Sequence, residues 1–169
     1  MTKNIVLTGM MGCGKSTVGR LLARRFRRPL ADTDALIEQR QGRSIPDIFT
    51  QDGEETFRAL ELKLSLELTG RSGLVIACGG GLPLQDGAIA PLKKSGLVFW
   101  LDRDPGQTYD SLDLSHRPLA QSGREDFIER YQDRAPIYQK WSDHIIRAGS
   151  PQEAEALIAD IICSGVSQA

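Results

Sequence analysis

The fold of this chain is decided by the segment Asn4-Ile5-Val6-Leu7-Thr8-Gly9-Met10-Met11-Gly12-Cys13-Gly14-Lys15-Ser16-Thr17. Its first five residues are nearly all apolar, which predicts a strand covered on both faces. The next nine match the pattern GxxxxGK[ST], and a helical pattern of apolar residues follows at Val18, Leu21, Leu22 and Phe26. A strand, this loop and a helix in that order indicate a phosphate-binding loop. A chance glycine-rich turn is the alternative, and the flanking elements disfavour it.

The residue types of this loop suit a nucleoside triphosphate. Its glycines let the backbone curl until successive N–H groups point inward at phosphate oxygens, and the helix start adds partial positive charge. Lys15 can then reach the β- and γ-phosphates, and the Ser16 hydroxyl can ligate Mg²⁺. We therefore expect ATP to bind at Gly12, Cys13, Gly14, Lys15, Ser16 and Thr17.

Beyond the loop, short apolar segments alternate with amphipathic ones, which predicts an α/β fold with a mainly parallel sheet of five strands flanked by helices. The expected strands are residues 4–8, 29–31, 74–78, 97–101 and 144–146. Besides the helix after the loop, we expect helices over 54–69, 124–131 and 151–162, the last with Ser150 as its N-cap. Residues 108–123 have weak periodicity, so we expect a mobile lid there with helical arms.

Composition limits the classes of function. The 169 residues fit one domain over 1–169, and a net charge of −1 gives no overall attraction to nucleic acid or anionic membranes. Three scattered cysteines without a CxxC pair suggest reduced thiols. No apolar run approaches the roughly 20 residues of a membrane span, and the first strand leaves no room for a leader. We expect a cytoplasmic protein without nucleic-acid or membrane partners.

Two carboxylates follow the second predicted strand in Asp32-Thr33-Asp34. Residues two apart on an extended chain project to the same side, and α/β sheets bind ligands at the carboxyl ends of their strands. Asp32 could serve Mg²⁺ through water, and Asp34 could take a proton from an acceptor hydroxyl. Capping of a helix over residues 35–41 is the alternative.

Three glycines and three arginines complete the candidate site. Gly79–Gly81 follow an apolar strand and could let a ligand approach the backbone, although a flexible turn would have the same sequence. The planar fork of arginine suits carboxylates and phosphates, which makes candidates of Arg58, Arg117 and Arg134. Each of them taken alone could equally be solvated surface.

The ordered set of motifs resembles the shikimate kinase family from Asn4 to about Ile162. The matching segments are Gly9–Thr17, Asp32–Asp34, Gly53–Arg58 with Glu61, Gly79–Gly81, Arg117–Leu119 and Arg134–Tyr138. The resemblance implies a three-layer P-loop fold and the ATP-dependent phosphorylation of shikimate to shikimate 3-phosphate, in aromatic amino acid biosynthesis. It implies Mg²⁺ as cofactor, ATP and shikimate as the small-molecule partners, and a monomer.

The resemblance also implies roles for single residues. Asp32 and Ser16 would serve the metal ion, and the catalytic residues would be Lys15, Asp34 and Arg117. Arg58 and Arg134 would bind the substrate carboxylate, and the triple glycine would contact the ring hydroxyls. The substrate-binding residues that the resemblance implies are thus Asp34, Arg58, Gly79, Gly80, Gly81 and Arg134. The substrate-binding segment of the domain would span about residues 32–62. Arg117 would close over the phosphates with the lid.

Two positions depart from the family pattern. Many members carry a basic residue seven positions before the lid arginine, where it stacks on adenine, but this chain has Asp110. His116, Arg103 or the loop near Ser150–Pro151 could pack the base instead. Trp141 stands where a small residue is usual, and core packing is its simplest explanation.

Two rival functions stay open. One is another small-molecule kinase with a P-loop, such as a gluconate or adenylylsulfate kinase. The other is a nucleotide-binding regulatory module without catalysis, against which the complete set of Lys15, Ser16, Asp34 and Arg117 argues.

Overall fold

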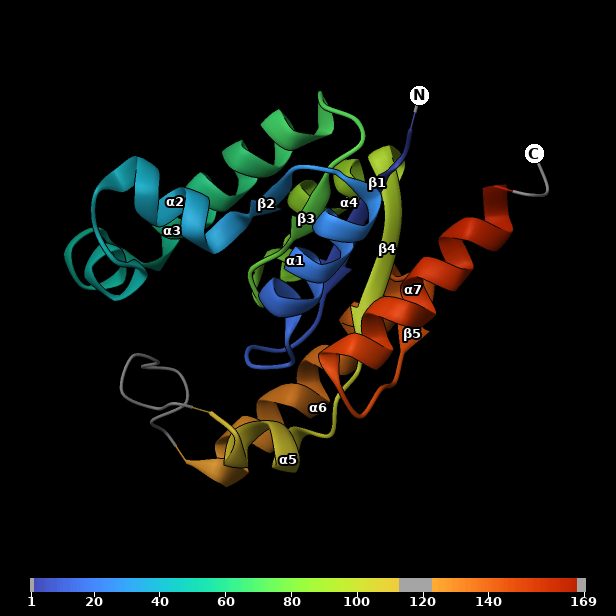
Figure 1. The fold of residues 1–169 in the computed structure, drawn as a ribbon. Coiled ribbons are helices and arrows are strands. Elements are labelled where there is room, and N and C mark those ends of the chain that lie inside the picture. Colours follow the sequence, from blue (N-terminus) through green and yellow to red (C-terminus); the bar gives the residue numbers. More distant parts are fainter. Residues whose placement is uncertain (1, 113–122, 167–169) are drawn as a thin grey trace.

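A computed structural model describes residues 2–112 and 123–166 of the chain. Five parallel strands form one sheet in the order β2-β3-β1-β4-β5. The strands are β1 (Asn4–Thr8), β2 (Leu30–Asp32), β3 (Val75–Ala77), β4 (Gly96–Leu101) and β5 (His144–Ile146). In this order β1 lies between β3 and β4, so the loop that follows β1 leaves the middle of the sheet (Figure 1).

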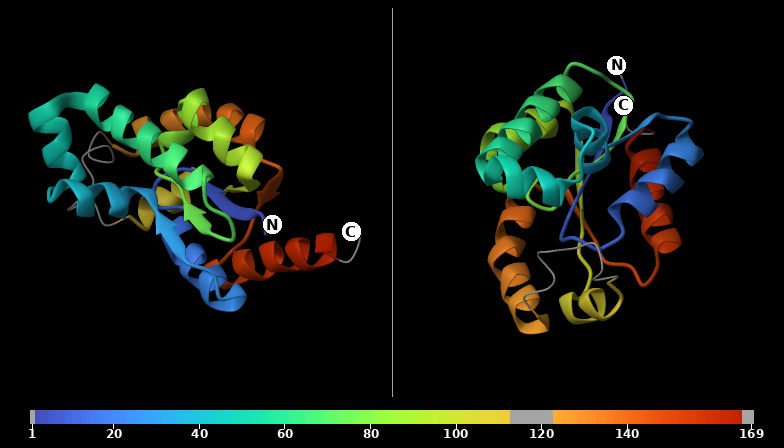
Figure 2. Two further views of the ribbon diagram at one scale, coloured as in Figure 1. Left: turned by 90° about the horizontal axis from the view of Figure 1, so that it is seen from above. Right: turned by 90° about the vertical axis from the view of Figure 1, so that its left-hand side faces the viewer.

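Helices cover both faces of the sheet, as the two turned views show (Figure 2). One face is covered by α1 (Lys15–Phe26) and α7 (Pro151–Val166). The other is covered by α3 (Ile45–Thr69), α4 (Asp86–Ser95) and α6 (Arg124–Trp141). Shorter elements near the carboxyl ends of the strands are α2 (Thr33–Gln41), η1 (Leu82–Leu84) and α5 (Pro105–Asp110).

Strand residues alternate between the two layers, because successive side chains of a strand point to opposite faces. Val6, Ile76 and Val98 pack with α3 and α4. Ile5, Val75 and Phe99 pack with α1 and α7. Burial on both faces explains why β1, β3 and β4 read as continuous apolar runs in the sequence. The predicted three-layer α/β fold is confirmed.

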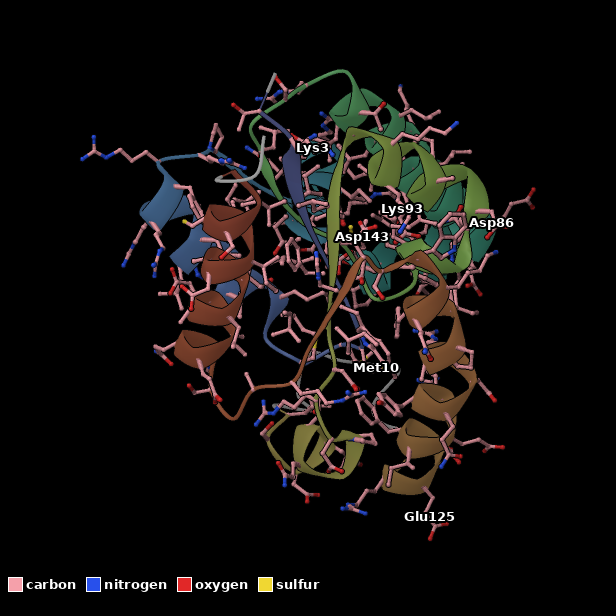
Figure 3. All side chains as sticks on the ribbon, turned by 90° about the vertical axis from the view of Figure 1, so that its right-hand side faces the viewer. Lys3, Met10, Asp86, Lys93, Glu125 and Asp143 are labelled. Atoms are coloured by element: carbon pink, nitrogen blue, oxygen red, sulfur yellow. The ribbon has the colours of Figure 1, made fainter. Side chains whose placement is uncertain are left out.

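A salt bridge fastens the last strand to the helical layer. Lys93 of α4 lies 2.8 Å from the Asp143 carboxylate just before β5, and Asp143 also accepts the backbone N–H of Val98 at 2.8 Å. Figure 3 shows Lys93 and Asp143 pointing toward each other. Both interactions favour the ionised carboxylate and hold the pKa of Asp143 below its usual value, although burial acts in the opposite direction.

The helices agree with the predictions in position but not in extent. The predicted helix over 54–69 is confirmed as the second part of α3; a first part from Ile45 was not predicted, and the two meet in a kink at Gly53, whose φ of 84° is left-handed. The helix from Arg124 runs ten residues further than predicted, past Pro136. The sequence analysis missed α4, which contains Pro91. Ser150 accepts the N–H of Glu153 at 3.2 Å, so the predicted N-cap of the last helix is confirmed.

The predicted lid over 108–123 lies mostly outside the described residues, and Arg117 lies there with it. Its described beginning belongs to α5 and the turn at Ser111. None of the helices within the described ranges is both long and apolar enough to cross a membrane.

Candidate active site

The loop between β1 and α1 requires glycine at three of its positions, because Gly9, Gly12 and Gly14 all have a positive φ. Gly9 and Gly12 have φ angles of 138° and 78°, which other residues rarely adopt. A Cβ on Gly9 would also lie 2.7 Å from the Leu101 carbonyl oxygen, and one on Gly12 would lie 2.3 Å from the Leu112 side chain. No side chain caps the first turn of α1. Its backbone N–H groups therefore remain available to an anion.

Lys15 is held across this loop by the loop's own backbone. Its ammonium donates to the carbonyl oxygens of Gly9 at 2.8 Å and Met10 at 2.9 Å, and its Nζ lies 3.8 Å from the Cys13 sulfur. The side chain is buried. A buried ammonium fixed in this way is positioned to meet phosphate oxygens that enter the loop.

Ser16 and Asp32 meet at the first turn of α1. The Ser16 hydroxyl donates to Asp32 Oδ2 at 2.5 Å, and Asp32 Oδ1 accepts the Ala35 N–H at 3.3 Å. Asp32 therefore caps α2, the alternative considered from the sequence, and also contacts the predicted metal-binding hydroxyl. One side chain does both because a carboxylate has two oxygens with separate lone pairs.

The predicted reason for the proximity of the two aspartates is wrong. The strand β2 ends at Asp32 and α2 begins at Thr33, so Asp34 lies in a helical turn and not on an extended chain. The helix cap at Asp32 ends the strand there. Asp34 nevertheless reaches the site, from the first turn of α2.

Asp34 is a half-buried residue near Lys15, and its Oδ1 atom is fully buried. Burial is the largest influence and raises the pKa of Asp34, while the charge of Lys15 acts to lower it. Asp34 Oδ1 has no hydrogen-bond partner in the part of the chain that the structure describes. A buried acceptor of this kind can accept a hydrogen bond from a hydroxyl group of a ligand, or take up its proton.

The triple glycine lies against three parts of the site. A Cβ built on Gly79 would lie 2.3 Å from Asp34 Oδ1, and one on Gly81 would lie 2.3 Å from Arg58 Nη1. One on Gly80 would lie 3.3 Å from the Met11 backbone nitrogen in the phosphate loop. None of the three has a left-handed φ. Close approach of neighbouring atoms, and not backbone conformation, therefore requires glycine here.

Arg58 is oriented by two glutamates on its own helix. Its Nη1 lies 2.7 Å from Glu61, which is 1% exposed, and its Nη2 lies 2.8 Å from Glu54, which is 63% exposed. Glu61 also accepts a hydrogen bond from Gln85 at 2.9 Å. Burial, partly offset by Arg58, raises the pKa of Glu61 to about 7. The sequence analysis quoted Glu61 in a motif but gave it no role.

Arg134 is linked to the triple glycine through Tyr138. It lies on α6, one turn before Tyr138, and its charge and a hydrogen bond from its side chain act on the Tyr138 hydroxyl. That hydroxyl donates to the Gly80 carbonyl oxygen at 2.7 Å. Arg58 therefore lies against Gly81 directly, whereas Arg134 is connected to Gly80 by way of Tyr138, to which the sequence analysis gave no role.

A cavity of about 70 Å³ opens beside the phosphate loop, between the start of α1 and the loop before α7. Cys13, Gly14, Arg103, Ser150 and Pro151 are among its lining residues. Three of the residues considered for packing the base thus line one cavity, whereas His116 lies outside the described residues.

The two departures from the family pattern have structural partners. Asp110 and Arg124 form an exposed ion pair with Arg124 Nε 3.0 Å from Asp110 Oδ1. Trp141 packs against the apolar cluster of α3 and α4 beneath one face of the sheet. The interpretation of Trp141 as a core residue is confirmed.

The chain is similar to known kinases in sequence and in fold. A family model described as shikimate kinase matches residues 11–163. A shikimate kinase of Clostridium botulinum is 38% identical over 150 residues, which are 89% of this chain and 90% of that relative. A structure of shikimate kinase from Acinetobacter baumannii, in complex with shikimate, superposes with a TM-score of 0.90 at 33% identity, covering 99% of this chain and 95% of that one.

A more distant match shares only the fold. A gluconokinase from Sinorhizobium meliloti superposes with a TM-score of 0.57 at 16% identity, covering 99% of this chain and 97% of that one. The family model, in contrast, spans the phosphate loop from Met11 onward, both aspartates, the triple glycine and α6. By sequence and by structure, this chain belongs to the shikimate kinase family.

Proposed function

We propose that this chain transfers the γ-phosphoryl group of ATP to the 3-hydroxyl of shikimate, a step of aromatic amino acid biosynthesis. One observation carries the proposal: the Asp34 carboxylate and the Arg58 guanidinium flank the same three glycines, and a Cβ on the middle glycine would lie 3.3 Å from the Met11 backbone nitrogen of the phosphate loop. This arrangement suits an acceptor that has a carboxylate at one end and a hydroxyl at the other. Shikimate is such a molecule, and the related enzyme from Acinetobacter baumannii was solved in complex with it.

Arg58 and Arg134 bind the substrate carboxylate in this proposal. Charge-assisted hydrogen bonds are roughly twice as strong as neutral ones, so two guanidiniums can hold one carboxylate firmly. Glu54 is exposed and can give up its place on Arg58 to the ligand, whereas the buried Glu61 keeps Arg58 in place. The glycine segment Gly79–Gly81 contacts the ring because it has no side chains in the way.

Asp34 receives the proton of the attacking hydroxyl. Its raised pKa makes it a better proton acceptor than an ordinary aspartate, and its unpaired Oδ1 is the atom that accepts. Burial raises the pKa of Asp34, while the charge of Lys15 acts to lower this pKa and so favours the ionised form that can accept the proton. The hydroxyl oxygen then attacks the γ-phosphorus, and ADP leaves.

Lys15, the start of α1 and Arg117 stabilise the charge on the transferring group. Positioning and electrostatic stabilisation supply most of the catalysis in phosphoryl transfer. Lys15 is held in the loop by two backbone carbonyls. Arg117 lies outside the described residues, and its role rests on the resemblance alone. The other members of Gly12–Thr17 bind the phosphates through backbone N–H groups.

Ser16 and Asp32 fit a magnesium ion that accompanies ATP. A hydroxyl and a carboxylate oxygen 2.5 Å apart are the hard oxygen ligands that Mg²⁺ prefers. Within the described ranges there is no group of three or more His, Cys, Asp or Glu residues that could hold a metal. One or two protein oxygens completed by phosphate and water oxygens are typical of Mg²⁺. The ion, when bound, neutralises charge on the β- and γ-phosphates.

We further propose that the chain acts as one kinase domain over 1–169, as a cytoplasmic monomer. The near-zero net charge and the absence of a spanning helix within the described ranges support small-molecule partners only.

The decisive experiment follows ADP release from MgATP with and without shikimate. Release that requires shikimate, with shikimate 3-phosphate as product, is the expected result. Gluconate and adenylylsulfate serve as control acceptors. Equal ADP release in the presence and absence of shikimate would exclude it as the acceptor, and no release with any acceptor would favour a regulatory nucleotide-binding module.

A further inference from the structure

Tyr138 is a fully buried residue between the two halves of the site. It lies on α6 with 0% exposure, and its ring centroid is 5.9 Å from that of Trp100 on β4. Met10 of the phosphate loop belongs to the same apolar cluster. Figure 3 labels Met10, which lies between the sheet and α6. The ring therefore packs directly behind the loop that holds the phosphates.

The hydroxyl of Tyr138 connects groups on both sides of the substrate position. It donates to the Gly80 carbonyl oxygen at 2.7 Å and lies 3.9 Å from the Met10 sulfur. The same oxygen interacts with the Arg134 side chain one helical turn away. A Cβ on Gly80 would lie 3.3 Å from the Met11 backbone nitrogen, so Gly80 lies close to the phosphate loop. One hydroxyl thus contacts the glycine segment, the carboxylate-binding arginine and the phosphate loop.

We propose that Tyr138 is a positioning residue for shikimate binding, whose hydroxyl fixes the Arg134 guanidinium and the Gly80 backbone at the spacing that the substrate requires. This inference rests on the proposed function, and it assigns to Tyr138 no contact with the reacting atoms. In this proposal Tyr138 does for Arg134 on α6 what the Glu61 carboxylate does for Arg58 on α3, where the two side chains form an ion pair.

Two physical arguments support a role beyond packing. A buried tyrosine could be replaced by phenylalanine for packing alone, whereas here the hydroxyl has a buried acceptor of its own and an arginine beside it. Burial, the larger influence, raises the pKa of Tyr138 to about 12. The hydroxyl therefore keeps its proton, and its hydrogen bond to Gly80, throughout the pH range in which a kinase works.

Arg134 needs such a partner because it is only half-buried on a helix surface. A long side chain loses conformational entropy when it is fixed, so a neighbour that limits its rotamers before binding strengthens the complex. The Gly80 peptide group also needs to be held in one orientation, because that orientation determines where the neighbouring N–H groups point.

The test compares Tyr138→Phe with Tyr131→Phe. Both remove a hydroxyl from α6 and keep the ring, and the Tyr131 hydroxyl donates to Asp102 at 2.5 Å, away from the glycines. In steady-state assays, we expect Tyr138→Phe to raise the KM for shikimate roughly tenfold, because hydrogen bonds that involve a charged group are the stronger ones. The kcat should stay within about threefold. Tyr131→Phe should leave the KM for shikimate within about twofold.

A double-mutant cycle with Arg134→Ala identifies the route of the effect. If Tyr138 acts through Arg134, its hydroxyl matters much less once the guanidinium is gone. The double variant should then raise the KM for shikimate by no more than about threefold beyond Arg134→Ala alone. Full additivity would exclude Arg134 as the route.

The outcomes separate this inference from the proposed function. An active wild type with an unchanged KM for shikimate in Tyr138→Phe would overturn the inference and leave the function standing. Equal losses of thermal stability and activity in both tyrosine variants, with the KM unchanged, would also overturn it, since they indicate packing alone. A wild type that neither binds shikimate in calorimetry nor phosphorylates it would overturn both.

Discussion

Arg58 and Glu61 form an ion pair with very unequal exposure: Nη1 lies 2.7 Å from Oε2, the arginine is 22% exposed and the glutamate 1%. A buried charge usually lowers stability unless its partners compensate for lost hydration. Here the compensation is incomplete, because the pKa of Glu61 stands at about 7 in spite of Arg58 and Gln85. The carboxylate of Glu61 thus lowers the stability of the fold, and it lies where it fixes Arg58, the arginine proposed to bind the substrate carboxylate.

Glu61 should make the folded state less stable as pH rises. The carboxyl ionises near its ordinary value in the unfolded chain but only near pH 7 in the folded chain. The folded state therefore binds more protons between these values. The contribution of Glu61 to the free energy of unfolding falls from about pH 4.5 to about 7, by roughly 3 kcal/mol, and then stays level.

Urea unfolding of Glu61→Gln and the wild type at pH 5 and pH 8 measures this contribution. The difference in free energy of unfolding between the two proteins should shift in favour of the variant at pH 8. Comparison with the variant cancels the titration of groups that do not interact with Glu61, such as Asp143. Parallel pH profiles of the two proteins would contradict the assignment.

Gly79→Ala should inactivate the enzyme without unfolding it. The added Cβ would lie 2.3 Å from Asp34 Oδ1 and 3.1 Å from Glu61 Oε1, so both carboxylates must move, while the backbone φ suits alanine. Because a displaced base loses its hydrogen-bond geometry, kcat should fall by about 100-fold or more.

Gly87→Ala is the matched control, since its Cβ would meet nothing closer than 3.5 Å, in the Leu62 side chain. Its activity should match the wild type. Wild-type kcat in Gly79→Ala would mean that Asp34 is not held where the structure has it.

Asp34→Asn should lower kcat by about 10² to 10⁴, the usual contribution of general base catalysis. Its free energy of unfolding should not fall, because the buried charge is removed. Glu38→Gln, one turn further along α2, is the control, since its side-chain oxygen can still accept the Ile45 N–H. Similar kcat values for the two variants would argue against Asp34 as the base.

Ser16→Ala should raise the Mg²⁺ concentration needed for half-maximal activity by about tenfold or more, because a metal ligand and the 2.5 Å bond to Asp32 are both lost. Ser16→Thr, which keeps the hydroxyl, should recover most of the Mg²⁺ affinity. Titration of activity with Mg²⁺ at fixed ATP makes the comparison, and an unshifted curve for Ser16→Ala would remove Ser16 from the metal site.

The sheet and the phosphate loop could be predicted from the sequence. Buried strands such as β1 are rich in apolar residues, and the loop depends on backbone N–H groups and glycines at fixed spacing, so both are encoded locally. Helix ends were harder to predict. Gly53 does interrupt α3, through its left-handed φ, but α6 continues past Pro136 because packing against the sheet overrides local preference.

How the acceptor site is supported could not be predicted from the sequence alone. Asp34 reaches the site through a helical turn that begins at the Asp32 cap, which alternation along a strand did not predict. Glu61 lies one turn from Arg58 on α3, and Tyr138 lies one turn from Arg134 on α6, so both pairs are close in sequence. The local spacing does not encode that Arg58 lies against Gly81 or that the Tyr138 hydroxyl donates to Gly80, because these contacts join residues far apart in the chain.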